Sequence, residues 1–348
     1  MELSLDLWGY LSTFIENDKQ RCYLMMTCKE MLLCKIYFYH QINIEKIINT
    51  VQFDYFTNVY AINNIVRLPK YILKLSLGSK VADYYIPSTI KKLTIGFNRP
   101  LLKCSIPTSV TYLKFEDYYN QPIKGIIPTS VTHLSLNHDF NQCIDDIPLS
   151  VTHLYFDGKF PIKGRIPLSV THLKFGHEFN QPIKNLIPPL VTHLTFSYNF
   201  NKPINNYLPS TITQLIFGTN FNQQVDYLPP SLTHLVFDSN FNKSVDNLPS
   251  SITHLTFGYD FDRSVDNLPS SITHLTFGLK FNQSIDKLPQ SVTHLVLRSR
   301  FNQSIDNLPS SIVHLTIGNT INYTIGRKVI NKLKFLKVGE VIIFSDYE

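Results

Sequence analysis

Charged residues are scarce in this sequence, at 17% of 348 residues against about a quarter in a typical protein. This low density excludes a charged coiled coil or a highly basic nucleic-acid scaffold. The five cysteines form no Cys-x-x-Cys pair and no Cys/His spacing typical of a metal site, so we expect reduced thiols in a cytosolic protein. No apolar run approaches the roughly 20 residues that span a bilayer. The first residues include acids rather than a basic stretch, so no signal peptide is expected.

Catalytic motifs are also lacking. The sequence has no phosphate-binding glycine loop, no nucleophile elbow, no triad spacing and no calcium-binding nonapeptide. We therefore predict that the chain is not an enzyme, with no catalytic residue, no metal and no cofactor. The net charge is +6, and residues 67–103 hold eight Lys and Arg against one Asp. This local excess favours contact with an acidic protein over a nucleic-acid or membrane partner.

Proline is unusually regular. Its 20 residues outnumber the 13 glycines, and 13 of the prolines recur at steps of 18 to 21 residues. They are Pro69, Pro87, Pro107, Pro128, Pro148, Pro167, Pro188, Pro209, Pro229, Pro249, Pro269, Pro289 and Pro309. A fixed period predicts a solenoid, and this period is too short for a propeller blade of about 40 residues or for helical hairpin repeats.

Each repeat, which we call a rung, predicts one short strand followed by an extended return. In residues 268–288, Leu275 and Phe277 are two apart, which is strand alternation, so His274 and Thr276 point the opposite way. Stacked rungs would pair their strands in parallel at about 4.8 Å and bury columns of Leu and Phe. Proline, which cannot donate to a strand ladder, fits the bend before each strand.

The motif resembles a known family. Residues 268–285 read Leu-Pro-Ser-Ser-Ile-Thr-His-Leu-Thr-Phe-Gly-Leu-Lys-Phe-Asn-Gln-Ser-Ile, which resembles the FNIP repeat, a leucine-rich-repeat-like unit, over about residues 67–325. Phe160-Pro161 departs from Phe-Asn, Gln214 replaces the histidine, and the rungs before Pro128 are degraded.

The N-terminal segment predicts helices, because apolar residues recur every four positions from Leu3 to Ile15 and a second apolar-rich segment covers 22–38. With Leu24-Met25-Met26-Thr27-Cys28-Lys29, this segment resembles an F-box in which Ser4 replaces the usual proline. That resemblance implies docking of a Skp-type linker of a cullin ubiquitin ligase through eight residues. They are Leu3, Leu7, Trp8, Leu11, Ile15, Thr27, Cys28 and Lys29. The alternative is a helical cap on the solenoid.

We therefore predict an α+β fold, with a small N-terminal helical domain followed by a parallel β-solenoid of about 13 rungs. The expected parts are an F-box-like domain (1–50), a linker or irregular first coil (51–66), an FNIP solenoid (67–325) and a C-terminal cap (326–348). In the cap we expect a short helix over 327–336 and a strand over 341–344. The resulting function is a substrate adaptor of a ubiquitin ligase in the cytoplasm (of the host cell if the chain is viral). The alternative is a protein-binding scaffold with no ubiquitin role.

Nine histidines share one position on the predicted open, concave face of the sheet. They are His133, His153, His172, His193, His234, His254, His274, His294 and His314. We expect their rings to stack, and we expect like charge at rung spacing to hold their folded pKa values below the unfolded ones. The repeated Asn residues are expected to bond backbone groups, and the repeated Asp residues to face turns or solvent.

Open-face positions differ most from rung to rung in the N-terminal part of the array, and the C-terminal part is more uniform. Surfaces that differ can select one partner, so we predict a target-binding site there, with unselected drift as the alternative. The predicted residues are Lys74, Lys92, Lys114, Glu116, Asn137, Tyr155, Asp157 and Lys174.

Overall fold

The structure is a computed structural model that describes residues 42–44, 54, 58–61, 68–80, 85–116, 118–318 and 333–345. These residues form a parallel β-solenoid of about 13 turns and contain no α-helix. The chain divides into two compact units, unit 1 up to Val151 and unit 2 from Thr152 onward. No helix in the described ranges is long and apolar enough to cross a membrane.

Unit 1 holds six short strands that pair in parallel with their neighbours in chain order. They are β1 (Ile42–Asn43), β2 (Asn58–Ala61), β3 (Lys74–Leu77), β4 (Lys92–Ile95), β5 (Tyr112–Phe115) and β6 (His133–Leu136).

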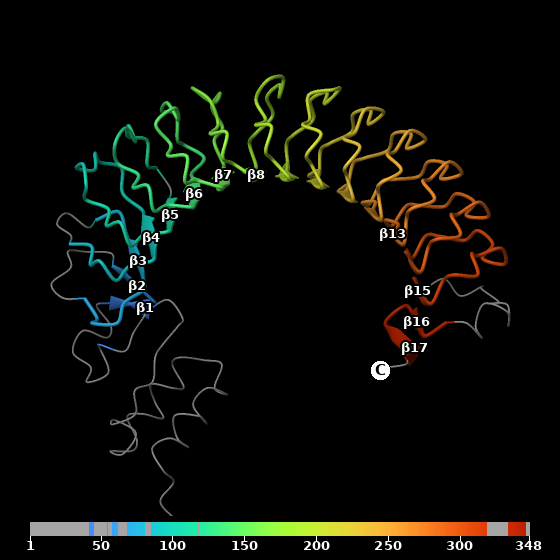
Figure 1. The fold of residues 1–348 in the computed structure, drawn as a ribbon. Coiled ribbons are helices and arrows are strands. Elements are labelled where there is room, and N and C mark those ends of the chain that lie inside the picture. The colour runs from blue at the N-terminus through green and yellow to red at the C-terminus, as the bar shows by residue number, and fades with distance from the viewer. Residues whose placement is uncertain are drawn as a thin grey trace, which may run out of the picture. The chain divides into compact units, whose positions relative to one another are not determined.

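Unit 2 continues the same pattern through β16 and ends in an antiparallel pair, β16–β17. Its strands are β7 (His153–Phe156), β8 (His172–Phe175), β9 (His193–Thr195), β10 (Gln214–Ile216), β11 (His234–Val236), β12 (His254–Thr256), β13 (His274–Thr276), β14 (His294–Leu297), β15 (His314–Ile317), β16 (Phe335–Val338) and β17 (Val341–Ser345). The register matches like residues, with His254 beside His274 and Leu255 beside Leu275. Within unit 2 the strands lie along the inner side of the curved ribbon and the returns along its outer side (Figure 1).

The core consists of columns that run across the rungs. Leu275 and Phe277 are buried, while His274 and Thr276 between them stay partly exposed, as strand alternation predicts. Phe rings of successive rungs stack at 5.6–5.8 Å, as from Phe237 to Phe257. A second Phe ring, from the return of the same rung, packs against the first. The ring centroids of Phe237 and Phe241, for example, are 3.7 Å apart. No single rung buries these rings, so the stability of the fold comes from neighbouring rungs.

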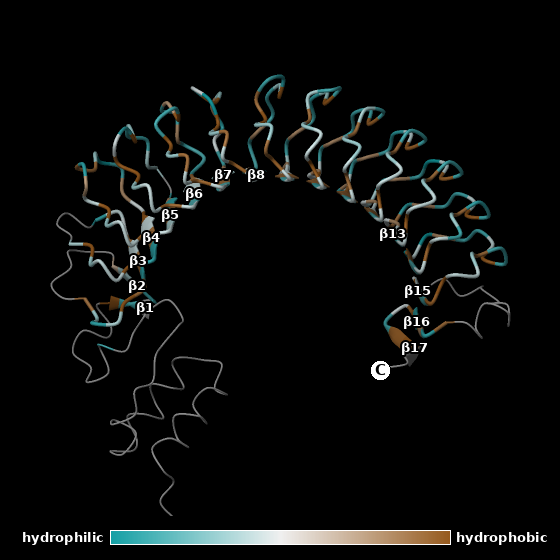
Figure 2. Ribbon diagram, in the orientation of Figure 1, coloured by the Kyte–Doolittle hydropathy of each residue, from teal (hydrophilic) through white to brown (hydrophobic). Residues whose placement is uncertain are grey.

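Each of the 13 repeated prolines sits in the turn before a strand. The carbonyl of Pro269 accepts a hydrogen bond from the amide of Ile272 at 3.2 Å, and the hydroxyl of Ser271 donates to the carbonyl of Ile252 in the preceding rung at 2.6 Å. The same pair of bonds recurs along the array. Hydrophilic residues gather at the outer bends of the rungs (Figure 2).

The returns are tied together by side-chain ladders. The side-chain oxygen of Asn222 accepts from the backbone amide of Asn242 at 3.0 Å, which confirms that the repeated asparagines bond backbone groups. Asp246 accepts from the Ser244 hydroxyl and from the amide of Asn267 in the next rung. These bonds favour the carboxylate and lower the pKa of Asp246. The Asp column is therefore a structural ladder between rungs.

The predicted α+β class is wrong for the described residues, which form a β-solenoid with no helical domain. The segment 1–41, which holds the predicted F-box-like helices, lies outside the described residues. Ile42–Asn43, placed in that helical domain, instead forms β1, because its backbone pairs with the edge of β2.

The C-terminal cap is corrected in part. The predicted helix over 327–336 is wrong at its end, since Phe335 and Leu336 belong to β16 and pair with His314 and Leu315; residues 327–332 lie outside the described part. The local apolar pattern favours a helix here, but the edge of β15 offers backbone hydrogen-bond partners in register, and the segment pairs with them as a strand. The final strand expected over 341–344 is confirmed as β17.

Candidate functional site: the open face of the sheet

Three columns of side chains form the open face, which is the side of each strand that points away from the core. The histidine column contains the residues in register with His274, and the middle column contains those in register with Thr276. The glycine column contains the residue two positions after the middle one, which is Gly278 in that rung. The Leu and Phe side chains point to the opposite side, so a partner that binds the open face would contact the residues of these three columns.

In unit 1 the open face is basic. Lys74 and Lys92 are register partners in the histidine column, and the Lys92 ammonium lies 5.3 Å from the centroid of the Tyr112 ring. In the next rung Lys114 forms an ion pair with Glu116 at 2.6 Å. These four charged residues were predicted from sequence, and the structure places all of them on this face.

Asn137 differs from the other predicted contacts because it is only 7% exposed. Its amide donates to the carbonyl of Tyr119 at 3.0 Å, and its side-chain oxygen accepts from the amide of Asp139. This residue stabilises a turn and presents little surface to a partner.

In unit 2 the predicted residues lie close together, with Tyr155 on β7, Asp157 directly after β7 and Lys174 on β8. The Lys174 ammonium is 5.3 Å from the centroid of the Tyr155 ring. Burial, followed by the charge and hydrogen bonding of Asp157, raises the pKa of Tyr155 to about 12. Binding of a target by these residues stays a prediction.

The histidine rings stack as predicted, with centroids 4.1–4.2 Å apart from His234 to His314. Each Nδ1 lies 2.9 Å from the hydroxyl of the preceding threonine, as at Thr273 and His274. The same hydroxyl donates to the carbonyl of Thr253 in the rung before, at 3.2 Å. At the last of these histidines a valine, Val313, replaces the threonine, and the Nδ1 of His314 is buried without a hydrogen-bond partner.

The column lowers histidine pKa values, as expected, at three of its members. Burial is the first cause and the charge of neighbouring histidines the second at His254, His274 and His294, and the pKa of His294 falls to about 4. The sequence reasoning named only the repulsion between like charges. Among the described residues no group of three or more His, Cys, Asp or Glu side chains is arranged to hold a metal ion.

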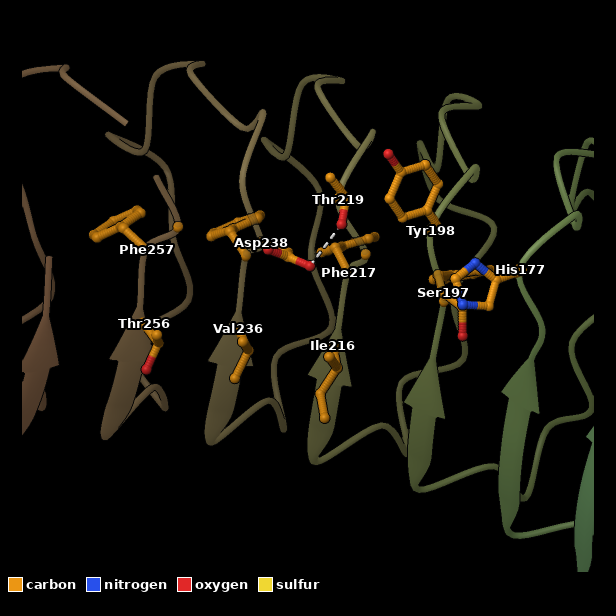
Figure 3. A pocket seen from close by; sticks show the side chains of 14 residues that line it. His177, Ser197, Tyr198, Ile216, Phe217, Thr219, Val236, Asp238, Thr256 and Phe257 are labelled. Atoms are coloured by element: carbon orange, nitrogen blue, oxygen red, sulfur yellow. Dashed lines mark hydrogen bonds between the residues drawn. The ribbon is translucent and has the colours of Figure 1, made fainter. Parts of the chain in front are cut away.

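A groove of about 490 Å³ lies across β9 to β12 on the open face of unit 2. Figure 3 shows Ile216, Val236 and Thr256 on three neighbouring strands, with Asp238 and Thr219 joined by a hydrogen bond beyond the strand ends. Asp238 is the only carboxylate among the lining residues. Sequence reasoning missed this groove because it treated the C-terminal rungs as uniform. The available signal was an acid in the glycine column with glycine in the rungs on both sides.

The repeat motif of the chain matches a family model. The model of the FNIP Repeat matches in nine segments between residues 97 and 320, which is more than half of the chain. The chain belongs to the FNIP repeat family. The matches begin after β3 and β4, so the FNIP solenoid includes rungs whose sequences have drifted from the motif while their strands keep the register.

A solved structure supports the leucine-rich-repeat-like character of this FNIP chain. It is the crystal structure of CroV588, described as a novel circular leucine-rich-repeat protein, with 32% identity and a TM-score of 0.61. The match covers 82% of this chain and 53% of CroV588, so the FNIP chain matches about half the length of that protein. No curated protein matches the chain.

The F-box resemblance finds no support in these comparisons, because the family matches start at residue 97. The eight residues predicted to dock a Skp-type linker all fall within 1–41, outside the described residues.

Proposed function

We propose that this FNIP chain is a protein-binding scaffold that holds a target protein against the open face of its sheet. The observation that supports the proposal is a repeated core beneath a varied surface. Buried positions repeat Leu and Phe from rung to rung, whereas open-face positions change between Lys, Tyr, Thr, Val and acidic residues. A stack of this kind forms an extended binding surface, and differences between rungs let a partner distinguish one place on it from another.

In unit 1 the face suits an acidic segment of a target. Lys74 and Lys92 are neighbours at the strand spacing of about 4.8 Å, and neither forms an ion pair with a described residue. Two adjacent ammonium groups repel each other, and a carboxylate placed between them would relieve that repulsion. Lys114 adds a third cation, although Glu116 already pairs with it.

The test compares charge reversal on and off the face. Proximity labelling with the full chain identifies partners, and the affinity of a purified partner is then measured by titration. The double variant Lys74→Glu with Lys92→Glu is expected to weaken binding about tenfold or more, because two attractive contacts become repulsive. The control is Lys80→Glu with Lys103→Glu, which makes the same charge change at exposed positions outside the three columns.

Equal affinities of the two double variants would show that the target does not use this face. The ligase-adaptor version of the function requires the N-terminal segment, and no described residue favours it. The proposal is therefore limited to target binding.

A further inference from the structure

In three rungs the glycine column holds an acidic residue. These rungs differ in the residue of the middle column, two positions before the acid. The acids are Glu116, Asp157 and Asp238, and the residues two positions before them are Lys114, Tyr155 and Val236. In the first rung the ammonium of Lys114 binds Glu116 at 2.6 Å. In the second, Asp157 acts on the hydroxyl of Tyr155 and, after burial, helps to raise its pKa. In the third, valine has nothing to donate, so the acid lacks the partner that its counterparts have.

The Asp238 carboxylate is held in place by its own turn and by the preceding rung. One oxygen accepts from the Thr219 hydroxyl at 2.8 Å, and the other accepts from the amide and hydroxyl of Ser239 at 2.7 and 2.9 Å. These three bonds fix its orientation and leave acceptor capacity, since a carboxylate offers about four lone-pair sites. The side chain is exposed and faces the groove.

Glycines flank Asp238 in the rungs on both sides, where the neighbouring backbones approach too closely for a side chain. A Cβ added at Gly258 would lie 2.2 Å from the carbonyl carbon and oxygen of Asp238, and one at Gly218 would lie 2.0 Å from the carbonyl oxygen of Ser197. The close approach of neighbouring backbones therefore requires glycine in both rungs. The result is a groove with aliphatic walls, Ile216 and Val236, that leads to one carboxylate.

We propose that this groove binds a cationic side chain, lysine or arginine, of the target protein. The aliphatic part of that side chain would pack on Ile216 and Val236, and its charged end would pair with Asp238. The pair would reproduce between two proteins the contact that Lys114 and Glu116 make within one rung. This inference rests on the proposed scaffold function and adds a specificity site in unit 2.

A purely structural role for Asp238 makes a different prediction. Asp157, in the same column, accepts from the amide of His177 at 2.9 Å, so acids here also stabilise turns. Asp238→Asn keeps an acceptor oxygen for the turn and removes the charge. It therefore separates turn stabilisation from recognition of a cation.

The experiment uses the full chain and immobilised pools of nonapeptides with random flanks and one fixed central residue. The fixed residue is lysine, arginine, norleucine or glutamate, and retained chain is measured for each pool. The lysine or arginine pool is expected to retain about two- to fivefold more wild-type chain than the norleucine pool, the range for an exposed ion pair. Asp238→Asn should lose this preference. The matched control Asp226→Asn, which changes the same charge in a return, should keep it.

A second pair of variants replaces Val236 in the groove wall with a longer side chain. Val236→Lys places an ammonium where Lys114 stands in its own rung, and it should abolish the preference, whereas Val236→Met should retain it. The inference is overturned if wild type shows no preference for a cationic pool, or if Asp238→Asn or Val236→Lys retains that preference. Such a result leaves the scaffold proposal standing, because that proposal is tested separately through Lys74 and Lys92.

Discussion

Acidification should weaken the solenoid through the histidine column, and His294 allows the effect to be worked out. Its pKa is about 4 in the folded chain and about 6.5 when unfolded. A base with a depressed folded pKa contributes stability above its unfolded pKa and loses it as pH falls. The loss therefore develops between pH 6.5 and about 4, where the unfolded chain binds a proton that the folded chain excludes.

The magnitude follows from linkage. Between pH 7.5 and pH 5, the full shift at His294 would cost about 2 kcal/mol of unfolding free energy. The ring is partly exposed, so solvent screening reduces this to about 1 kcal/mol. His254 and His274 act with the same sign.

The perturbation is His294→Gln, which the chain itself tolerates in this column at Gln214. Hydrogen exchange, corrected for its intrinsic pH dependence, measures the opening free energy of β13 to β15 at pH 7.5 and pH 5. Wild type should lose about 1 kcal/mol more than His294→Gln over this interval. The control His177→Gln removes an exposed histidine outside the column.

Loss of two stacking contacts will lower the stability of His294→Gln at both pH values, since its ring lies 4.1 Å from each neighbour. The decisive quantity is therefore the difference between the two pH values. Identical differences for wild type and His294→Gln would refute the reasoning.

Three further predictions concern the stack itself. Phe237→Ala should lower the free energy of unfolding in urea by about 3–5 kcal/mol, because its ring is 1% exposed; Phe237→Leu should cost less, and equal costs would contradict a packing role. Gly258→Ala should lower the urea midpoint, since its Cβ would meet the backbone of Asp238 at 2.2 Å; an unchanged midpoint would contradict the close approach. Ser271→Ala should cost about 1 kcal/mol by hydrogen exchange, because the carbonyl of Ile252 loses a donor; unchanged protection of this rung would show that water replaces the hydroxyl.

The rungs could be predicted from sequence because their signals are local and repeated. The spacing of Leu275 and Phe277 identifies the strand and its buried side, and Pro269 marks the turn before it. Where one rung departs from the motif, as at Gln214, the rungs before and after it still identify the strand position. At the ends no repeat was available, and local apolar patterns suggested helix where β1 and β16 pair with an existing sheet edge.

The groove was missed because it depends on contacts between rungs, and its sequence signal appears only when residues one period apart are compared. Asp238 reads as another varied residue until the glycines 20 residues before and after it are seen as its spatial neighbours. The threonine contact with each histidine was missed for the opposite reason. Thr273 and His274 are adjacent in sequence, yet strand alternation predicts that they point apart. The contact arises because the threonine precedes the strand.

The threonine contacts also link the histidine protons to the backbone of the rung before. In the run from Thr233 to Thr293, each hydroxyl lies within hydrogen-bond distance of a carbonyl in the preceding rung and 2.9 Å from the Nδ1 of the histidine that follows it. A hydroxyl has one hydrogen, so a hydroxyl that donates it to the carbonyl accepts at the ring, and Nδ1 then carries the hydrogen of that contact. A hydroxyl that donates to Nδ1 instead requires the other tautomer, in which the ring hydrogen is on Nε2. The repeated threonine contact thus couples the tautomer of each of these four imidazoles to the direction of one hydroxyl hydrogen.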